Sequence, residues 1–309
     1  MCCWVGRDRE HLWVRARRGR EHGDSLCAPG SGRTAAGGVE INLLDARGEA
    51  PTESLTRYAP PVIARFDAGD PFELILASVR HDQLPALVPV LADGAGEAEI
   101  LLCNNLWSSL DPIDAVLRGR YLWGFPVAGG GFEDGRLEAA LLTTVRLGDP
   151  SGAAADRLES LGRLFGGCGL SVEFEAGMLA WLWVHFAIEA GIIAAAAKAG
   201  GVAAFLDDVE RIADGVLAVR DAFAVVKAGG IEPASVLDAQ MFVAPEHEAA
   251  VGIKQFYAVD RAARKIMERH TGGAALKRIY GDVVATGRSL AVEMPALEAC
   301  GPFVEALPR

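Results

Sequence analysis

The sequence predicts an α/β protein in which a Rossmann-like N-terminal domain is followed by an all-helical C-terminal domain. Two apolar runs, Phe72–Val79 and Ile100–Cys103, bracket a helical pattern, and polar residues follow each run. This order is typical of parallel strands whose carboxyl ends carry a ligand site. From Gly177 onward the sequence shows long helix-periodic segments and no strand pattern. The first strand and the glycine loop that normally open such a fold are missing from residues 1–38.

Local signals place the elements in order. Pro85 is tolerated in the first turn of a helix, Asp111-Pro112 is a good helix start, and Asp134-Gly135 is a hairpin turn. Paired glycines separate the C-terminal helices. The expected strands are Val39–Leu44, Val62–Phe66, Phe72–Val79, Ile100–Cys103, Tyr121–Phe125, Leu137–Leu147 and Leu170–Phe174. The expected helices are Leu84–Leu91, a short one from Asp111, Ser151–Leu164, Met178–Ala199, Val202–Lys227, His247–His270 and Ala274–Leu290.

These elements predict three regions. Residues 1–38 are expected to be an aberrant, disordered segment, since they hold seven Arg against four acidic residues and show neither strand alternation nor a helix stripe. Residues 39–174 are expected to form the dinucleotide-binding domain, and residues 175–309 a helical domain for substrate binding and dimerisation.

Composition excludes several classes of protein. The 309 residues are 51% apolar and 23% charged, which is typical of a globular chain. The net charge of −11 makes a nucleic-acid partner improbable. Of the six Cys, three lie in residues 1–38, and the scattered Cys103, Cys168 and Cys300 match no metal-binding spacing, so we expect reduced thiols, no metal site and a cytoplasmic location. The N-terminus lacks the apolar core of a secretory signal.

One apolar segment has the length of a membrane span. Residues Ala176–Ala197 are almost wholly apolar, but His185 and Glu189 interrupt them at mid-length, and both would be costly in lipid. We therefore expect a buried central helix of a soluble domain, with no membrane partner.

Four short motifs occur in order on the expected elements. They are Ser78-Val79-Arg80-His81-Asp82-Gln83, Cys103-Asn104-Asn105, Leu182-Trp183-Val184-His185-Phe186, and Gly281-Asp282-Val283-Val284 before Met294-Pro295. Together they resemble the ketopantoate reductase family, whose NADP-dependent members reduce 2-dehydropantoate to pantoate, over roughly residues 39–295. The family shows Val-Lys-x-x-Gln, Gln-Asn-Gly and Leu-Trp-x-Lys-Leu at the first three places.

The resemblance implies roles for several residues. Asn104 matches the asparagine beside nicotinamide and substrate, and its amide can both donate and accept. Arg80 replaces a lysine near the cofactor phosphates or the substrate carboxylate, and Gln83 completes that motif. Gly130, within Gly129–Gly131, would let the backbone approach the nicotinamide. The alternatives are a strand-end cap for Asn104, a solvated loop residue for Arg80 and a plain hairpin loop for the glycines.

The family's catalytic positions are substituted. His185 stands where the family has the lysine that protonates the substrate carbonyl, and Glu189 replaces an asparagine one turn later. Ala263 and Ala275 occupy the places of a substrate serine and an acidic residue. Four changes put ketopantoate itself in doubt as substrate.

The spacing of His185 and Glu189 offers a replacement acid. Residues at i and i+4 share one helix face, so the carboxylate could accept from one imidazole nitrogen and raise the His185 pKa. The other nitrogen could then protonate a carbonyl as hydride arrives. The alternatives are a structural pair and, less favoured, a metal site, for which only two ligands are visible.

The missing glycine loop has a possible explanation in the reading frame. Shifting the frame by one base within the codons for Trp4 and Val5 permits Gly-x-Gly-x-Thr-Gly over residues 4–10, followed by a helix and a strand that ends in Arg. An Arg there suits an NADP 2′-phosphate. We therefore hypothesise that residues 1–38 are a frame-shifted cofactor loop; the alternative is a genuine, disordered basic arm.

Three functional hypotheses follow. The first is an NADP-dependent oxidoreductase for a 2-keto acid or similar small carbonyl compound, with His185 as acid and Asn104 and Arg80 orienting the substrate. The second is a non-catalytic relative that binds a ligand or partner in the same interdomain cleft. The third is a damaged gene product that does not fold. The helical domain offers surfaces for a homodimer.

Overall fold

The structure is a computed structural model of the chain, and it describes residues 12–16, 25–26, 38–59, 62–63, 67–70, 72–152, 154–269 and 273–308. For residues 12–16, 25–26, 62–63 and 126–127 it describes the backbone alone. The chain forms two compact units. The first comprises Met1–Asn104 and Ser108–Met178, and the second comprises Asn105–Trp107 and Leu179–Arg309. Three residues that follow a strand of the first unit thus belong to the second.

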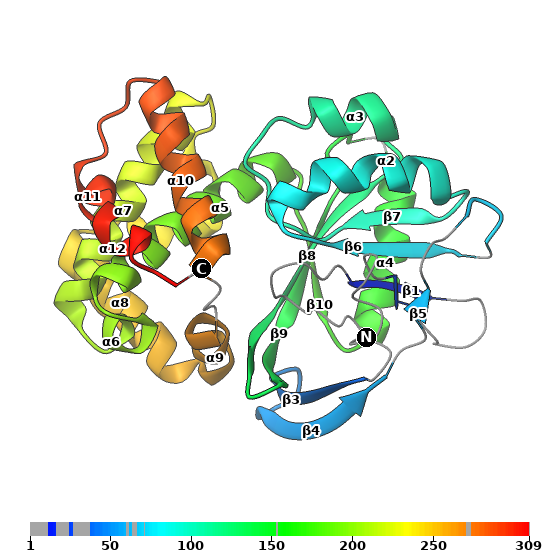
Figure 1. Ribbon diagram of the computed structural model, residues 1–309, viewed down its shortest axis with the longest axis horizontal. Coiled ribbons are helices and arrows are strands. Elements are labelled where there is room, and N and C mark those ends of the chain that lie inside the picture. The colour runs from blue at the N-terminus through cyan, green and yellow to red at the C-terminus, as the bar shows by residue number, and fades with distance from the viewer. Residues whose placement is uncertain are drawn as a thin grey trace. The chain divides into compact units, whose positions relative to one another are not determined.

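The first unit is built on a mixed ten-stranded sheet (Figure 1). Its strands are β1 (Leu12–Ala16), β2 (Ser25–Leu26), β3 (Val39–Asp45), β4 (Thr52–Tyr58), β5 (Val62–Ile63), β6 (Leu74–Ser78), β7 (Glu99–Leu102), β8 (Leu122–Glu133), β9 (Arg136–Gly148) and β10 (Ser171–Phe174). They lie in the order β4-β3-β9-β8-β7-β6-β1-β2-β5, with β10 paired to β9. Its helices are the 3-10 turn η1 (His81–Gln83), α2 (Leu84–Gly94), α3 (Asp111–Leu117) and α4 (Ala155–Gly167).

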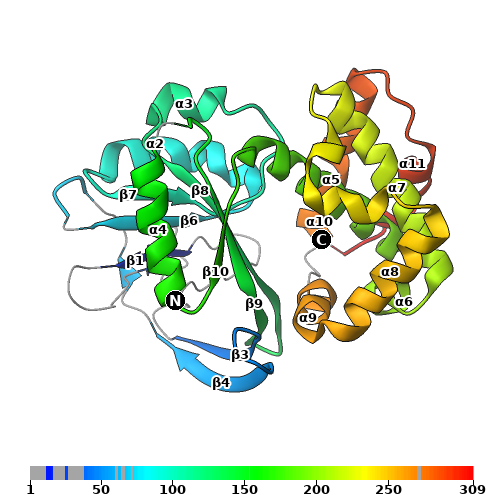
Figure 2. The ribbon, with the colours of Figure 1, turned by 180° about the vertical axis from the view of Figure 1, so that it is seen from behind.

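Strands β6, β7 and β8 run parallel at the centre of the sheet, as the apolar runs predict. Leu101 of β7 lies in a core cluster with Leu161 and Phe165 of α4. Because side chains alternate across a strand, Ile100 and Leu102 point to the opposite face, and both are fully buried. Figures 1 and 2 show α4 on one face of the sheet and α2 on the other. The strands are therefore covered on both sides, as parallel strands require.

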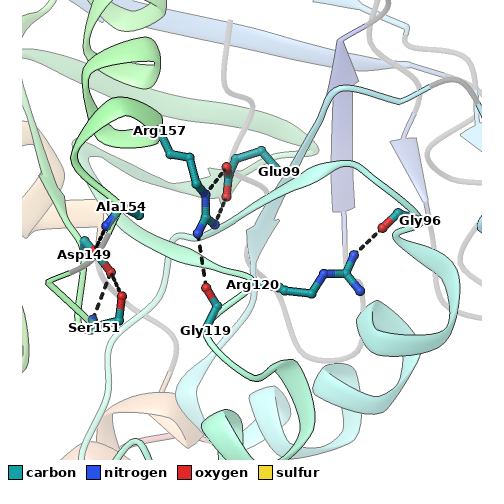
Figure 3. A network of polar contacts seen from close by, with 8 residues as sticks. All are labelled: Gly96, Glu99, Gly119, Arg120, Asp149, Ser151, Ala154 and Arg157. Atoms are coloured by element: carbon teal, nitrogen blue, oxygen red, sulfur yellow. Dashed lines mark hydrogen bonds and ion pairs between the residues drawn. The ribbon is translucent and has the colours of Figure 1, made fainter.

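Ion pairs and caps fix α4 to the start of the parallel strands (Figure 3). The Arg157 guanidinium on α4 donates to both carboxylate oxygens of Glu99, at 2.7 and 2.5 Å, and to the Gly119 carbonyl at 3.2 Å. Asp149 accepts hydrogen bonds from the backbone N–H groups of Ser151 and Ala154 at the beginning of α4. These contacts lie at the amino end of β7, away from the edge where its polar residues follow.

The second unit has helices and no strands among its described residues, as expected. Its elements are α5 (Met178–Lys198), α6 (Val202–Leu206), α7 (Val209–Ala228), η2 (Pro233–Ser235), η3 (Leu237–Phe242), α8 (Glu246–Val259), α9 (Arg261–Arg269), α10 (Gly273–Ser289), α11 (Pro295–Ala299) and α12 (Gly301–Glu305). Helix α5 crosses α7 closely: a Cβ on Gly191 would meet the Val219 backbone nitrogen at 2.6 Å. By length and composition α5 could span a membrane, but 67% of its apolar window is buried in the protein.

Four details of the sequence prediction are wrong. Gly129–Gly131 lies inside β8 rather than in a loop, and pairs with β9. Strand β4 was not expected, because all but one of its side chains are exposed and no apolar alternation marks it. The expected helix Val202–Lys227 divides at Asp208, whose side chain caps α7. The expected helix His247–His270 divides at Asp260, whose Oδ1 accepts from the Ala263 N–H; its last residue, His270, lies outside the described residues.

Residues 1–38 differ in part from the expectation. Most of them lie outside the described residues, so neither the disorder nor the shifted-frame helix is tested there. Strand β1, however, pairs with β6 from Leu12↔Ser78 to Ala16↔Leu74, so the edge of β6 is covered. The apolar pattern missed this strand because backbone pairing to an open sheet edge does not require alternation. Strand β1 is antiparallel to β6, whereas a dinucleotide fold opens with a parallel strand.

Candidate functional site

The end of β6 is organised around Arg80. The backbone N–H of Arg80 donates to Gln83 Oε1 at 3.2 Å, which closes the turn before α2. The Arg80 side chain forms an ion pair with Asp82, with Nε–Oδ1 at 3.0 Å and Nη2–Oδ2 at 3.3 Å. Two predicted cofactor residues, Arg80 and Gln83, are thus brought together. An anion bound at Arg80 would have to share its guanidinium with Asp82, which the sequence analysis did not consider.

Asn104 follows β7 at the same edge of the sheet. The ladder between β6 and β7 continues to Cys103, whose N–H donates to the Ala77 carbonyl at 2.7 Å. Asn104 is 4% exposed, and its carbonyl oxygen accepts a hydrogen bond from the indole Nε1 of Trp123 at 2.9 Å. Trp123 is completely buried on β8. The main chain at Asn104 is therefore fixed by a neighbouring strand, and the choice between a ligand-binding amide and a strand-end cap stays a prediction.

Asn105 is linked to Glu189 in the second unit. Its side-chain Nδ2 donates to Glu189 Oε2 at 2.5 Å. A hydrogen bond from an amide to a carboxylate is strengthened by the charge of the acceptor. Glu189, the predicted carboxylate partner of His185, is therefore oriented by Asn105, a residue for which the sequence predicted no role.

Trp107 anchors the same segment to α5 and α10. Its ring stacks on Trp183 with a centroid distance of 4.7 Å and on Phe186 at 5.1 Å. Its Nε1 donates to Thr286 Oγ1 at 2.9 Å, and that hydroxyl in turn donates to the Asp282 carbonyl. Aromatic stacking and a satisfied indole N–H hold Asn105 in place opposite Glu189.

His185 lies against another tryptophan of α5. The imidazole ring stacks on Trp181, with centroids 4.8 Å apart and planes 17° apart. Trp181 is 3% exposed, and its Nε1 donates to Asp238 Oδ2 on η3 at 3.0 Å. The predicted proton donor is thus positioned by a ring that is itself held by a carboxylate.

Trp181, His185 and Glu189 form one stripe on α5. Their spacing of four residues places all three on one face of the helix, as the sequence predicted for His185 and Glu189. The stripe presents an indole, an imidazole and a carboxylate in succession, with Asn105 bound to Glu189 at one end and Asp238 bound to Trp181 at the other. A direct hydrogen bond between His185 and Glu189 stays a prediction.

Gly130 approaches a different group from the one expected. A Cβ at this position would lie 2.2 Å from the Glu138 carbonyl oxygen and 2.7 Å from the Ala139 Cα, both on β9. The close approach that requires glycine here is therefore between two strands. A role beside a nicotinamide stays a proposal.

The two alanines at substituted family positions lie on the C-terminal helices. Ala263 is buried on α9 and Ala275 is half-buried on α10. Neither side chain can donate or accept a hydrogen bond, so this chain offers no hydroxyl or carboxylate of its own at those two places. No group of three His, Cys, Asp or Glu side chains that could hold a metal ion occurs in the part of the chain that the structure describes.

A nicotinamide dinucleotide fits the residues that follow β6 and β7 better than it fits the start of the chain. Arg80 and Asn104 at the ends of β6 and β7 are chemically suited to a phosphate, carboxylate or carboxamide. The start of the chain is not suited to a pyrophosphate. Its sequence has no Gly-x-Gly-x-x-Gly. The antiparallel β1 also ends beside Leu74, at the edge opposite to the ends of β6 and β7.

The sequence analysis missed Asn105, Trp107, Trp181 and Asp238. Trp181 was detectable, because it precedes His185 by four residues on a predicted helix and must share its face. Asp238 lies 53 positions beyond His185 in a segment without helical periodicity, so nothing local indicated its contact.

Comparison with known proteins supports the fold. No family model matches the chain, and no curated protein matches it. Among solved structures, D-mandelate dehydrogenase in complex with NADH is 13% identical with a TM-score of 0.60, over 85% of this chain and 84% of that one. The 2-dehydropantoate 2-reductase from Geobacter metallireducens GS-15 is 15% identical, with a TM-score of 0.58 over 87% of each chain.

A third structure is the 2-dehydropantoate 2-reductase from Methylococcus capsulatus, which is 18% identical with a TM-score of 0.56, over 89% of this chain and 85% of that one. All three likenesses extend over most of both chains, so the order of a Rossmann-like unit and a helical unit is shared as a whole. The chain therefore has the fold of the ketopantoate reductases, a Rossmann-like domain followed by a helical domain.

Proposed function

We propose that this protein is an oxidoreductase that reduces a 2-keto acid or a similar small carbonyl compound, with NADPH as hydride donor and His185 as proton donor. The observation that carries the proposal is the stripe of Trp181, His185 and Glu189 on α5, in a fold shared with reductases. The imidazole takes the place of the family's lysine, so a proton donor is kept on that helix face although its chemical type has changed.

The chain's own residues supply the proton chemistry. A protonated His185 would give its proton to the carbonyl oxygen of the substrate, and the negative charge of Glu189 one turn away favours the protonated imidazole. Asn105 keeps that carboxylate in a fixed orientation. Arg80 and Asn104 would bind a carboxylate or carboxamide through charge and hydrogen bonds. NADPH, when bound, would supply the hydride.

Ketopantoate is not the substrate we favour. The four substituted positions remove a lysine, an asparagine, a hydroxyl and an acid that the family uses, so a place in pantothenate biosynthesis is not part of the proposal. The mandelate-type relative shows that this fold also occurs in an enzyme named for another 2-hydroxy acid. A panel of 2-keto acids with different side chains is the appropriate test set.

A second candidate is a non-catalytic relative that binds a ligand or partner. The antiparallel β1 and the missing glycine loop favour it, because both weaken a pyrophosphate site. The two candidates differ in one measurable property, namely binding and oxidation of the dinucleotide. They share the fold, so structural similarity alone does not separate them.

The decisive experiment measures the loss of NADPH and NADH absorbance at 340 nm with the 2-keto acid panel. His185→Ala should abolish the activity, and His247→Ala, which changes an exposed histidine on α8, should leave it intact. Activity unchanged in His185→Ala would remove that residue from the mechanism. The same assay also tests the hypothesis of a frame-shifted cofactor loop, if it is repeated on a protein whose first 38 residues are translated in the shifted frame. Turnover by that protein alone would mean that residues 1–38 of the present sequence lack a working cofactor loop.

We also propose that the protein acts in the cytoplasm on small molecules and forms a homodimer. A ketopantoate reductase from Staphylococcus aureus with the same fold, at a TM-score of 0.52 and 14% identity, is described as dimeric. Light scattering on the purified protein should give twice the chain mass of 32.6 kDa. A mass of one chain at micromolar concentration would contradict the dimer.

A further inference from the structure

A carboxylate outside α5 binds the edge of the Trp181 ring, on whose face His185 stacks. Asp238 Oδ2 lies 3.0 Å from Trp181 Nε1, and the six-residue turn η3 that carries Asp238 is fixed by the buried Ala239 and Phe242. The same indole stacks on the His185 imidazole at 4.8 Å with nearly parallel planes. The three side chains therefore form a continuous array from η3 to the middle of α5.

This array distinguishes the two protonation states of His185. The face of an indole ring carries negative charge, so a cation above it is attracted, whereas a neutral imidazole gains only stacking. An anionic acceptor at the indole N–H polarises that bond and makes the ring face more negative. The full charge of Asp238 lies at the N–H edge of the same ring and favours the imidazolium as well. Both effects stabilise His185 when it carries a proton.

We propose that Asp238 is a positioning residue that acts through Trp181 to orient His185 and to keep it protonated near neutral pH. The inference rests on the proposed function, in which His185 is the proton donor. It adds a residue from another element of the unit and a reason why an imidazole can replace a lysine, since a histidine left without support is largely neutral at pH 7.

Among the described residues, the other charged groups near α5 are bound elsewhere or lie farther along the helix. Glu189 also favours the protonated imidazole, but it lies one turn after His185 on α5, whereas Trp181 lies one turn before it. The Glu189 carboxylate is bound by Asn105. From α7, the uncharged Gly215 and Val219 lie against Ala195 and Gly191 of α5. The ion pair of Lys198 with Asp214 lies more than three turns beyond His185. From α10, Thr286 reaches this region through Trp107, with Asp282 one turn before it.

The test is an NMR titration of His185, because it needs neither substrate nor cofactor. With 13C-labelled histidine, the chain gives six imidazole signals, and the one lost in His185→Gln is that of His185. We expect Trp181→Leu and Asp238→Asn each to lower the His185 pKa by roughly 0.5 unit or more. Asp238→Asn keeps an oxygen that can accept from the indole, so it removes the charge with little change of shape.

Two further variants make the outcome decisive. Glu232→Gln removes one negative charge from an exposed residue six positions before Asp238 and should leave the His185 pKa unchanged. Asp238→Glu keeps the charge and should restore most of the shift. If Trp181→Leu lowers the pKa and Asp238→Asn does not, the role of Asp238 is overturned. If Glu232→Gln has the same effect as Asp238→Asn, the effect is only general charge, which also overturns the proposal. If the variants change the His185 pKa as expected but the protein reduces no 2-keto acid, the proposed function is refuted and the role of Asp238 is not.

Discussion

The side-chain amide of Asn105 donates a 2.5 Å hydrogen bond to the carboxylate of Glu189. The family that this chain resembles has a glycine and an asparagine at these two places, so both partners of the bond are departures from the family. A glycine has no side chain to bind position 189, and an asparagine there carries no charge. The two substitutions thus form one structural unit, and they place a negative charge one turn from His185.

Replacing Asn105 by aspartate tests this pair. Two carboxylates would then meet where one amide now donates, and like charges in a half-buried site repel. At pH 7 we expect a loss of about 2–4 kcal/mol in the free energy of unfolding, from the missing bond and the repulsion together. Urea denaturation at pH 7 and pH 4.5 should show the loss shrinking in acid, where one carboxylate takes up a proton.

Asn105→Ala is the control, because it removes the bond without adding a charge. Its loss of about 1–3 kcal/mol should differ little between the two pH values. Equal losses for the aspartate and alanine variants at pH 7 would mean that Glu189 carries no charge in the folded protein.

The Arg157 contacts with Glu99 and Gly119 predict a geometric requirement that charge alone cannot meet (Figure 3). The planar guanidinium fork binds both carboxylate oxygens and a carbonyl at once, and a lysine cannot reproduce this pattern. We therefore expect Arg157→Lys and Arg157→Met to lower the free energy of unfolding by a similar amount, about 1–2 kcal/mol. Thermal unfolding followed by circular dichroism measures both.

Arg163→Lys is the matched control on the same helix. Arg163 is 71% exposed, and its ion-pair partner Glu159 lies 3.7 Å away. Exposed pairs of this kind contribute little, so a change within about 0.5 kcal/mol is expected. An Arg157→Lys protein with wild-type stability would contradict the geometric argument.

The sequence was a good guide where apolar residues determine the structure. Strands β6 and β7 and helix α5 occur within a few residues of their predicted bounds, because their side chains enter a core and periodicity records that burial. Strand β4 was invisible for the same reason: its side chains are exposed, and its position depends on backbone pairing with β3. Gly129–Gly131 was misassigned because glycine usually marks a turn, whereas here it allows β9 to approach β8.

In the candidate site, too, local spacing could be predicted and long-range contacts could not. The shared helix face of His185 and Glu189 followed from a spacing of four residues, which any helix preserves. The contacts of Asn105 with Glu189 and of Trp181 with Asp238 join residues 84 and 57 positions apart. Such pairs depend on how the chain is packed, and a single sequence does not reveal them. The direction of β1 was beyond prediction too, because either direction satisfies the hydrogen bonds of an open edge.

The ionised Asp45 carboxylate contributes to the free energy of unfolding, and this contribution is lost in acid. Its carboxylate accepts from Arg47 Nε at 2.9 Å and from Nη2 at 2.6 Å, and this hydrogen bonding holds the pKa of Asp45 below its usual value. A carboxyl group with a lowered folded-state pKa stabilises the protein above its unfolded pKa, near 4. That contribution disappears as the pH falls through the lower folded-state value.

We therefore expect Asp45→Asn to cost about 1 kcal/mol between pH 5 and 7 and progressively less below pH 4. Urea midpoints of the two proteins should converge as the pH approaches 2. Asp67→Asn, on an exposed turn of the same unit, serves as a comparison for the general effect of removing one carboxylate. A difference between wild type and Asp45→Asn that stays constant from pH 7 to pH 2.5 would rule out the ionised pair as its source.

Gly130 lies where a strand contact and a proposed cofactor contact can be separated by experiment. Any side chain there would collide with the β9 backbone, since a Cβ would lie 2.2 Å from the Glu138 carbonyl oxygen. Backbone cannot move aside as a flexible side chain can, so Gly130→Ala should lower the free energy of unfolding by about 2–3 kcal/mol. Gly166→Ala on α4, where a Cβ would meet nothing within 4 Å, should be neutral or slightly stabilising.

The cofactor question then depends on the fraction of Gly130→Ala that remains folded. If the glycine serves only the pairing of β8 with β9, the folded variant should bind NADPH with the affinity of the unaltered protein in a fluorescence titration at 10 °C. A loss of affinity without a matching loss of stability would mean that the absent Cβ makes room for the dinucleotide. Because the strand contact is present whether or not a ligand binds, a stable Gly130→Ala protein would contradict the described register of β8 on β9.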